Sequence, residues 1–185
     1  PYDAAIHTFG TAGTGGFSNY GASIAAFHSP LIEWIITFFM VLFGINFALF
    51  YRAITGDWRD ALRSEELRWY LGIYGAATIF STMLLLPRYH GFWEALRYGS
   101  FQVASVMSTT GYATADFNLW PVAVKMVLLL VMIVGGCAGS TAGGIKVVRT
   151  ALLFKLGRRE IRHTFQPRKV QVLSLIHISE PTRRR

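Results

Sequence analysis

The chain has 185 residues, of which 52% are hydrophobic and only 15% are charged, and its formal net charge is +8. This composition is too apolar for an ordinary soluble domain of this length and predicts an integral membrane protein. The basic residues lie outside three long apolar runs instead of covering a folded surface, which argues against a nucleic-acid-binding protein. The single cysteine, Cys137, excludes a disulfide framework.

Residues 1–53 contain a polar, glycine-rich stretch followed by the first apolar run. The chain starts in loop-like sequence without an initiating Met, which indicates an internal fragment whose leading helix is missing. Ser29 and Pro30 are typical of a helix start, because Ser can cap free amides and Pro suits the first turn. At about 1.5 Å per residue, residues 31–50 are long enough to cross the roughly 30 Å of bilayer hydrocarbon.

A charged loop separates the first crossing from the second. Residues 54–68 are rich in arginine, and the segment 52–68 is predicted to face the cytoplasm, because positively charged loops stay on that side. The apolar residues 69–86 then return the chain to the outside. Gly72 and Gly75 in this run favour close packing between helices.

The next segment predicts a helix that enters the membrane without crossing it. Residues 93–108 are too short and too polar for a full crossing, and the negative end of this helix would favour a cation at the loop that follows. Residues 119–134 are the third crossing, with Asn118 as the expected cap and Lys125 reaching toward the headgroups. A glycine-rich break at 135–144 interrupts it, since each glycine costs about 1 kcal/mol relative to alanine in a helix.

The C-terminal part of the chain is basic. Residues 146–171 are predicted to be cytoplasmic by the same charge rule as 52–68, and residues 151–171 form a separate basic segment after the last unit. Residues 172–185 continue neither pattern and are interpreted as a non-native tail.

Two short motifs share the pattern Thr-x-Gly-aromatic. Hydroxyl and glycine residues between apolar segments predict an extended backbone whose carbonyl oxygens turn toward a ligand. Rings of such carbonyls bind dehydrated potassium ions. The predicted ion-binding residues are Thr14, Gly15, Gly16 and Phe17 in the first motif and Thr109, Thr110, Gly111 and Tyr112 in the second.

The two motifs belong to an internal repeat. When Gly16 is aligned with Gly111, each motif is followed by a polar connector, a long apolar run and a basic segment. This order predicts all-α repeats of helix, re-entrant pore loop and helix, as in potassium channels, with residues 69–150 as one complete copy. Two loops cannot encircle an ion, so a closed ring needs about two more loops or a second chain.

Three motifs resemble the TrkH/TrkG family of membrane subunits of bacterial potassium uptake systems, in the Trk/Ktr/HKT superfamily. They are Thr-Gly-Gly-Phe-Ser, Ser-Thr-Thr-Gly-Tyr-Ala-Thr-Ala-Asp-Phe-Asn-x-Trp-Pro and Gly-Gly-Cys-Ala-Gly-Ser-Thr-Ala-Gly-Gly-Ile-Lys-Val-Val-Arg. The resemblance covers residues 1–170. It implies an all-α fragment of a four-repeat pore in the bacterial inner membrane, holding the second filter loop and the whole third repeat.

The resemblance also implies roles and partners. Potassium is the expected transported ion, bound by filter carbonyls, and no cofactor is expected. A cytoplasmic nucleotide-binding TrkA-type subunit, the lipid bilayer and a second full-length chain are the expected partners. The glycine break is expected to be a gate that obstructs the pore below the filter. Its residues are Gly135, Gly136, Cys137, Ala138, Gly139, Ser140, Thr141, Ala142, Gly143 and Gly144.

Several alternatives remain open from the residues themselves. The glycine break could serve close helix packing, whereas a phosphate-binding loop is disfavoured because Ile145 and Lys146 follow it. Asp116 could attract cations or cap the next helix. The chain could be a non-transporting membrane scaffold or receptor. An enzyme is disfavoured, because the apolar region lacks a convergent set of acid, base or nucleophile.

Overall fold

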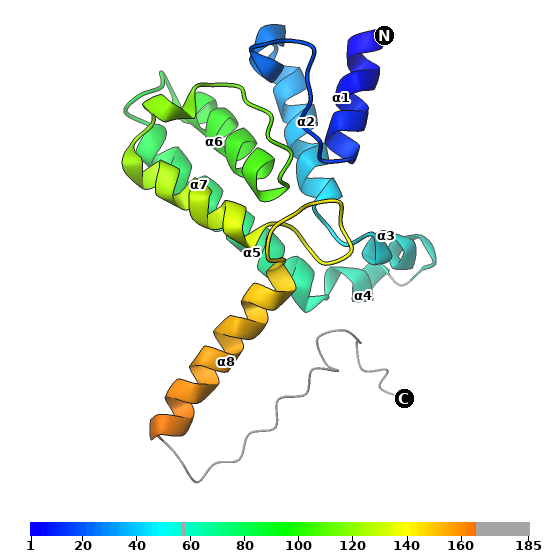
Figure 1. The fold of residues 1–185 in the computed structure, drawn as a ribbon, viewed down its shortest axis with the longest axis vertical. Helices are drawn as coiled ribbons and strands as arrows, with labels where there is room; N and C mark the ends of the chain where they lie inside the picture. The colour runs from blue at the N-terminus through cyan, green and yellow to red at the C-terminus, as the bar shows by residue number, and fades with distance from the viewer. Residues whose placement is uncertain (57, 166–185) are drawn as a thin grey trace.

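The structure is a computed structural model that describes residues 1–56 and 58–165, and this part of the chain consists of helices and loops without a strand (Figure 1). The elements in chain order are α1 (Tyr2–Ala12), η1 (Ser23–Phe27), α2 (Pro30–Phe43), α3 (Phe47–Ile54), α4 (Trp58–Leu62), α5 (Glu65–Leu85), α6 (Phe92–Met107), η2 (Phe117–Leu119), α7 (Val122–Val134) and α8 (Val147–Phe165), where η marks a 3₁₀ helix. The predicted tail at 172–185 lies outside the described residues.

Helices α5 and α6 form the centre of the packing. Helix α5 lies against α6 and α7, and it also contacts α8. Helix α6 joins this group to the N-terminal part, since it packs against α2, which in turn contacts α1. In Figure 1, α8 extends away from the other helices, at the opposite end of the molecule from α1.

The first apolar run is not the single straight helix that the sequence predicts. Helices α2 and α3 meet at a bend of 92°. A Cβ at Gly44 would lie 2.2 Å from the phenol oxygen of Tyr70, so the close approach of α5 requires glycine here. Asn46 then starts α3, because its side chain accepts a hydrogen bond from the Ala48 amide at 2.9 Å.

The bend divides the first apolar run into two helices, each too short to cross a membrane by itself. Among the described residues, no single helix is both long enough and apolar enough to cross a membrane alone, while α2 and α3 pass that test as a bent pair. The predicted re-entrant helix 93–108 is confirmed as a helix, since α6 has 16 residues over almost the same range.

The sequence analysis did not predict helix α1, because it interpreted the start of the chain as loop-like, and it placed the start of α5 too late. Helix α1 precedes the first motif in a stretch whose polar and small residues form no apolar run. Helix α5 begins inside the predicted charged loop 54–68, because the Ser64 side chain accepts a hydrogen bond from the Leu67 amide at 3.3 Å. Glu65 and Glu66 in its first turn also favour the positive end of the helix dipole.

The prediction of Asn118 as a helix cap is wrong. The carboxylate of Asp116 accepts a hydrogen bond from the Asn118 amide at 2.9 Å and so caps η2. Helix α7 starts only after Pro121. Capping is therefore the role that the structure shows for Asp116, and Lys125 donates a hydrogen bond to the Asn118 carbonyl at 3.1 Å.

The predicted close packing at Gly72 and Gly75 is absent from the described residues, since a Cβ at either position would meet no atom within 4 Å. The small residue that lets α5 and α6 approach is Gly99, whose Cβ would lie 3.2 Å from the Thr82 hydroxyl. Ser81, one residue earlier on α5, is fully buried.

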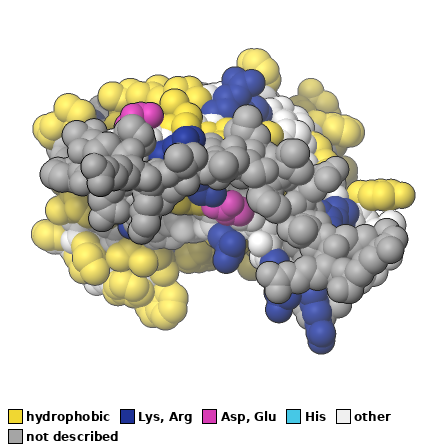
Figure 2. Space-filling view, turned by 90° about the horizontal axis from the view of Figure 1, so that it is seen from below, with side chains coloured by type: hydrophobic (Ala, Val, Ile, Leu, Met, Phe, Trp, Pro, Cys, Tyr) yellow, Lys and Arg dark blue, Asp and Glu magenta, His cyan; other side chains and the backbone are white. Residues whose placement is uncertain are grey.

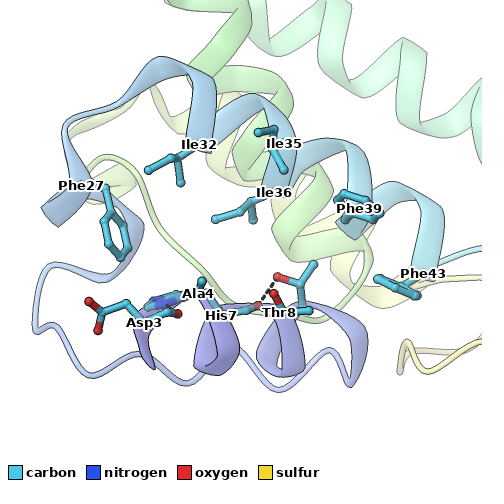
Figure 3. Close-up of a pocket in the computed structure, with 11 residues that line it drawn as sticks. Asp3, Ala4, His7, Thr8, Phe27, Ile32, Ile35, Ile36, Phe39 and Phe43 are labelled. Atoms are coloured by element: carbon cyan, nitrogen blue, oxygen red, sulfur yellow. Dashed lines mark hydrogen bonds between the residues drawn. The ribbon is translucent and has the colours of Figure 1, made fainter. Parts of the chain in front are cut away.

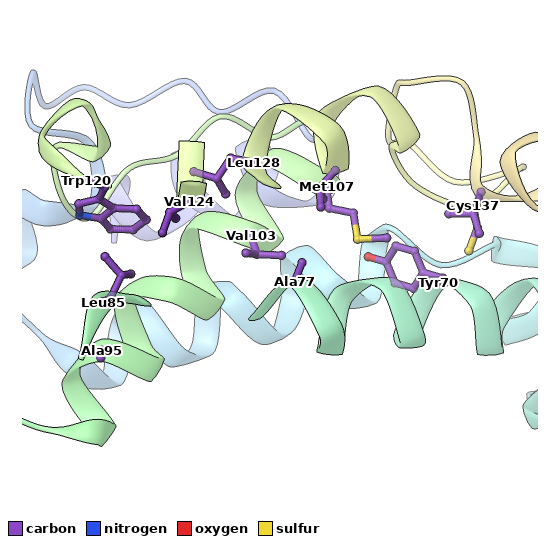
Figure 4. Packing of buried hydrophobic residues seen from close by; sticks show 12 residues of the cluster. Tyr70, Ala77, Leu85, Ala95, Val103, Met107, Trp120, Val124, Leu128 and Cys137 are labelled. Atoms are coloured by element: carbon purple, nitrogen blue, oxygen red, sulfur yellow. The ribbon is translucent and has the colours of Figure 1, made fainter. Parts of the chain in front are cut away.

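The largest buried cluster lies between α5, α6 and α7. Leu85, Val103 and Val124 are completely buried and belong to this cluster. At its other end, Tyr70 of α5 lies beside Cys137 of the glycine-rich break (Figure 4). The same core therefore holds the third repeat together and positions the break.

A buried ion pair joins the two repeats. The guanidinium Nε of Arg97 on α6 lies 3.2 Å from a carboxylate oxygen of Glu33 on α2. The exposed fractions of the two side chains are 15% and 6%. Removal of one partner would leave a charge in an apolar environment, which costs far more than the pair contributes.

We expect Arg97→Leu to lower the free energy of unfolding by about 3 kcal/mol, because Glu33 is left unpaired, and Arg97→Leu with Glu33→Leu to recover most of that loss. Denaturant unfolding of the full-length protein in detergent measures both. Arg88→Leu, at an exposed arginine, is the matched control. Equal destabilisation by the single and double variants would contradict the role of the pair.

Candidate functional site

Each predicted ion-binding motif follows a helix and folds back on the end of that helix. After α1, the amide of Gly15 donates a hydrogen bond to the Gly10 carbonyl at 2.8 Å. After α6, the amide of Thr110 donates to the Ser105 carbonyl at 2.9 Å. These residues occupy equivalent positions when Gly16 is aligned with Gly111, so the repeat extends to individual hydrogen bonds. We call the segments 14–17 and 109–112 the first and second filter loops, after the role that the sequence analysis predicts for them.

The backbone angles of the two loops also agree. Thr14 and Thr109 have φ values of 49° and 56°, and Gly16 and Gly111 have values of 66° and 89°. Positive φ is costly for threonine and costs glycine little. Because both loops adopt this costly backbone conformation at matching positions, the two loops have the same local fold.

Most carbonyl oxygens of these loops lack a hydrogen-bond donor among the described residues. Within residues 1–56 and 58–165, the carbonyls of the first three residues in each loop accept no hydrogen bond. These residues are Thr14, Gly15, Gly16, Thr109, Thr110 and Gly111. Carbonyl oxygens left without a donor can instead coordinate a cation.

Tyr112 connects the two filter loops. Its side chain is fully buried, and its hydroxyl donates to the Phe17 carbonyl at 3.3 Å. The loops touch directly as well, since a Cβ at Gly16 would lie 1.8 Å from the Thr110 carbonyl oxygen. The aromatic residue of the first loop differs, because Phe17 is 81% exposed.

The glycine-rich break forms a loop between α7 and α8 that contacts both filter loops. The Thr109 hydroxyl accepts a hydrogen bond from the Gly143 amide at 2.7 Å. The Thr14 hydroxyl donates to the Thr141 carbonyl at 2.9 Å. We call residues 135–144 the glycine loop. The structure thus brings together all three of the segments that the sequence analysis selected.

The bend between α2 and α3 holds the first half of the glycine loop. The Cys137 amide donates to the Gly44 carbonyl at 2.9 Å, and the Phe47 amide donates to the Gly139 carbonyl at 3.1 Å. Sequence analysis did not select the bend, because Gly44 is one glycine within an apolar run and its importance comes from these long-range bonds.

The two ends of the glycine loop are in close contact with each other. Gly135 has a φ of 71°, and a Cβ there would lie 2.2 Å from the Gly143 carbonyl oxygen. A Cβ at Gly136 would lie 2.5 Å from the Ala142 methyl carbon. These glycines therefore allow contact within the loop, and close packing between helices does not explain them.

Helix α8, which follows the glycine loop, packs against the start of α5. Lys155 forms an ion pair with Glu65, and the Trp69 and Phe154 rings lie 5.9 Å apart. The hydrogen bond from Lys155 holds the pKa of the Glu65 carboxyl below its ordinary value. Partial burial alone would raise this pKa, but its effect is smaller.

The described histidines do not belong to a metal site. His7 lies on α1, where one ring nitrogen is 3.0 Å from the Ser18 hydroxyl and the other is 2.7 Å from the Asp3 carbonyl. Within the part of the chain that the structure describes, no group of three His, Cys, Asp or Glu side chains could hold a metal ion.

An apolar groove lies between α1 and α2 (Figure 3). Its volume is about 440 Å³. Ile32, Ile35, Ile36 and Phe39 line it from the α2 side, and His7 lies on the α1 side.

Comparison with known proteins identifies this arrangement. The family model described as "TrkH: Cation transport protein" matches residues 1–89 and 92–179. The chain belongs to the TrkH family. The match confirms the predicted class of helical membrane proteins with pore-loop repeats, and it extends into the segment 172–185 that the sequence analysis interpreted as a tail.

Individual relatives agree with the family model. The chain is 35% identical to "Trk system potassium uptake protein TrkH" of Salmonella typhimurium, over 98% of this chain and 38% of that protein. It is 34% identical to "Trk system potassium uptake protein TrkG" of Escherichia coli, over 90% of this chain and 35% of that protein. The chain therefore spans less than half the length of these relatives.

A solved structure has the same fold. The crystal structure of the potassium transporter TrkH from Vibrio parahaemolyticus is 34% identical, with a TM-score of 0.89 over 95% of this chain and 38% of that one. The arrangement of helices and loops in this chain is thus that of a part of a TrkH-family transporter.

Gly135→Ala is expected to lower thermal stability markedly, because the added methyl group meets backbone atoms at a positive φ. Gly157→Ala is the matched control, since it lies in α8 and its Cβ would meet nothing within 4 Å. That variant should gain about 0.5–1 kcal/mol. Thermal unfolding of the full-length protein distinguishes them, and equal effects would contradict the close contact within the glycine loop.

Proposed function

We propose that the chain forms part of a potassium-translocating pore, as a segment of a Trk-type membrane subunit. The observation that carries this proposal is the pair of filter loops, which repeat the same backbone geometry and leave the carbonyls of their first three residues without donors among the described residues. Such carbonyls can replace the water around a potassium ion. Helices α1 and α6 direct their negative ends toward the loops, which favours a cation there.

A complete pore needs more chain than these residues contain. Two filter loops cannot surround an ion, and four repeats are the arrangement that the family resemblance implies. Tyr112 of the second loop packs against α1 of the preceding repeat, whereas the equivalent Phe17 is exposed. Phe17 would then contact the repeat before it, and the groove between α1 and α2 would receive the outer helix that completes the second repeat.

The glycine loop is the proposed gate. Its hydrogen bonds to Thr14 and Thr109 support a position beside the filter, where movement of the loop would open or close the path of the ion. In this proposal no enzyme activity and no cofactor are involved. A TrkA-type nucleotide-binding subunit would control the gate, and two full-length chains would form a homodimer.

The charge distribution supports an orientation in the bacterial inner membrane. Seen from the end at which α8 lies, Lys and Arg side chains are spread over the face of the molecule (Figure 2). Arg63, Arg68 and Arg158 are exposed. Segments 52–68 and 146–171 would face the cytoplasm, as the positive-inside rule requires; residues 166–171 lie outside the described part.

Substitutions in the filter loops test the transport proposal. Gly16→Val should abolish rubidium uptake by the full-length protein, because the side chain collides with the Thr110 carbonyl. Gly111→Val should also impair uptake or selectivity, through its positive φ, although its Cβ meets no atom within 4 Å. Normal rubidium uptake and unchanged selectivity in both variants, at normal membrane levels, would contradict the filter assignment.

Ion-dependent stability distinguishes a transporter from a non-transporting scaffold. Potassium or rubidium bound to the filter should raise the thermal unfolding temperature of the full-length protein, because a ligand that binds only the folded state stabilises it. Sodium and lithium should have a smaller effect at equal ionic strength. Equal unfolding temperatures in all four salts would favour the scaffold.

A further inference from the structure

Glu66 is a charged residue that touches the glycine loop from outside. It lies in the first turn of α5 and is partly buried. One carboxylate oxygen accepts a hydrogen bond from the Ala138 amide at 2.5 Å. The two residues are far apart in the sequence, so only the tertiary fold brings this carboxylate to the loop.

The other oxygen of Glu66 reaches the bend between α2 and α3. It accepts a hydrogen bond from the Asn46 side-chain amide at 3.4 Å. The oxygen of that amide accepts from the Ala48 backbone at 2.9 Å, which sets the orientation of the Asn46 side chain. Asn46 also contacts the glycine loop, since a Cβ at Gly139 would lie 2.9 Å from its oxygen. Glu66 therefore bridges the glycine loop and the bend.

Most other hydrogen bonds of the loop are made by neutral groups, apart from that of the Lys146 ammonium group, which donates to the Ala142 carbonyl. The filter threonines contact residues 141 and 143 with neutral hydroxyls, and the bend contacts residues 137 and 139 with neutral backbone groups. A carboxylate that accepts from an amide forms a hydrogen bond about twice as strong as a neutral one. The Glu66 bond to Ala138 is therefore a charged contact that joins the loop to a helix distant in the sequence, whereas Lys146 lies just after the loop in the chain.

We propose that Glu66 is a positioning residue for the gate, which holds the glycine loop against the bend and must release the Ala138 amide before the loop can move. The proposal rests on the gating role given to the loop above. It adds a residue outside the filter and the loop, and it identifies the interaction whose loss opens the path.

Cys137 provides a direct measurement of loop movement. It is the only cysteine among the 185 residues, it is fully buried, and it precedes the residue that Glu66 holds. Displacement of the loop would expose its thiol to a maleimide. The rate of alkylation of the peptide that contains Cys137, followed by mass spectrometry in the full-length protein, reports the loop without requiring ion transport. The Glu66 charge also acts on this thiol, so Glu66→Ala is compared with Glu66→Gln, which lacks the same charge.

Three variants give the test. Glu66→Ala should raise the alkylation rate about tenfold, and Glu66→Gln by a smaller factor of about three, because glutamine keeps a neutral acceptor. Glu65→Gln is the matched control, since the Glu65 carboxylate pairs with Lys155 and not with the loop. Its rate should stay within about twofold of the unmodified protein. Rubidium leak should rise in the same order as alkylation.

Alkylation of Glu66→Ala at the unmodified rate would overturn the proposal, as would equal increases in Glu66→Ala and Glu65→Gln. If Glu66→Ala does not fold, the test uses Glu66→Gln. An alkylation rate of Glu66→Gln that is no higher than the rate of Glu65→Gln then overturns the proposal. Absence of rubidium flux in the unmodified protein would overturn the proposed transport function alone. The alkylation rates would still decide whether Glu66 holds the loop.

Discussion

The hydrogen bond from each filter loop back to its own helix is the constraint on which the proposed ion pathway depends. Gly15 donates to Gly10 and Thr110 donates to Ser105, so the amides of both loops turn inward. The described residues offer no donor to the carbonyls of the first three residues in each loop. The positive φ angles at the threonine and glycine of each loop are the cost of this arrangement.

The glycine loop and the bend between α2 and α3 depend on each other. The bend frees the Gly44 carbonyl from a helix and supplies it to the Cys137 amide. Tyr70 fills the space that the glycine leaves, and its hydroxyl donates to the Val41 carbonyl at 3.0 Å. A straight α2 would satisfy its own carbonyls and leave the loop without this support. A single interruption in one repeat therefore positions a loop in the next.

Sequence reasoning predicted the features that depend on local composition. The two Thr-x-Gly-aromatic motifs, the short polar helix before Gly111 and the interruption at 135–144 follow from which residues are neighbours in the chain. It missed the bend and α1, and it placed the start of α7 wrongly. Each of these depends on a partner elsewhere or on a cap, such as Tyr70 against Gly44 or Asp116 before Asn118.

The sequence by itself determined the class of the protein, its repeat and the segments proposed to form the pathway, because apolar length, charge placement and glycine spacing are properties of neighbouring residues. Only the tertiary structure decided how those segments meet. Contacts such as Thr109 with Gly143 and Glu66 with Ala138 join residues far apart in the chain. No periodicity encodes such pairs, because they arise when packed helices bring one unsatisfied donor to one unsatisfied acceptor.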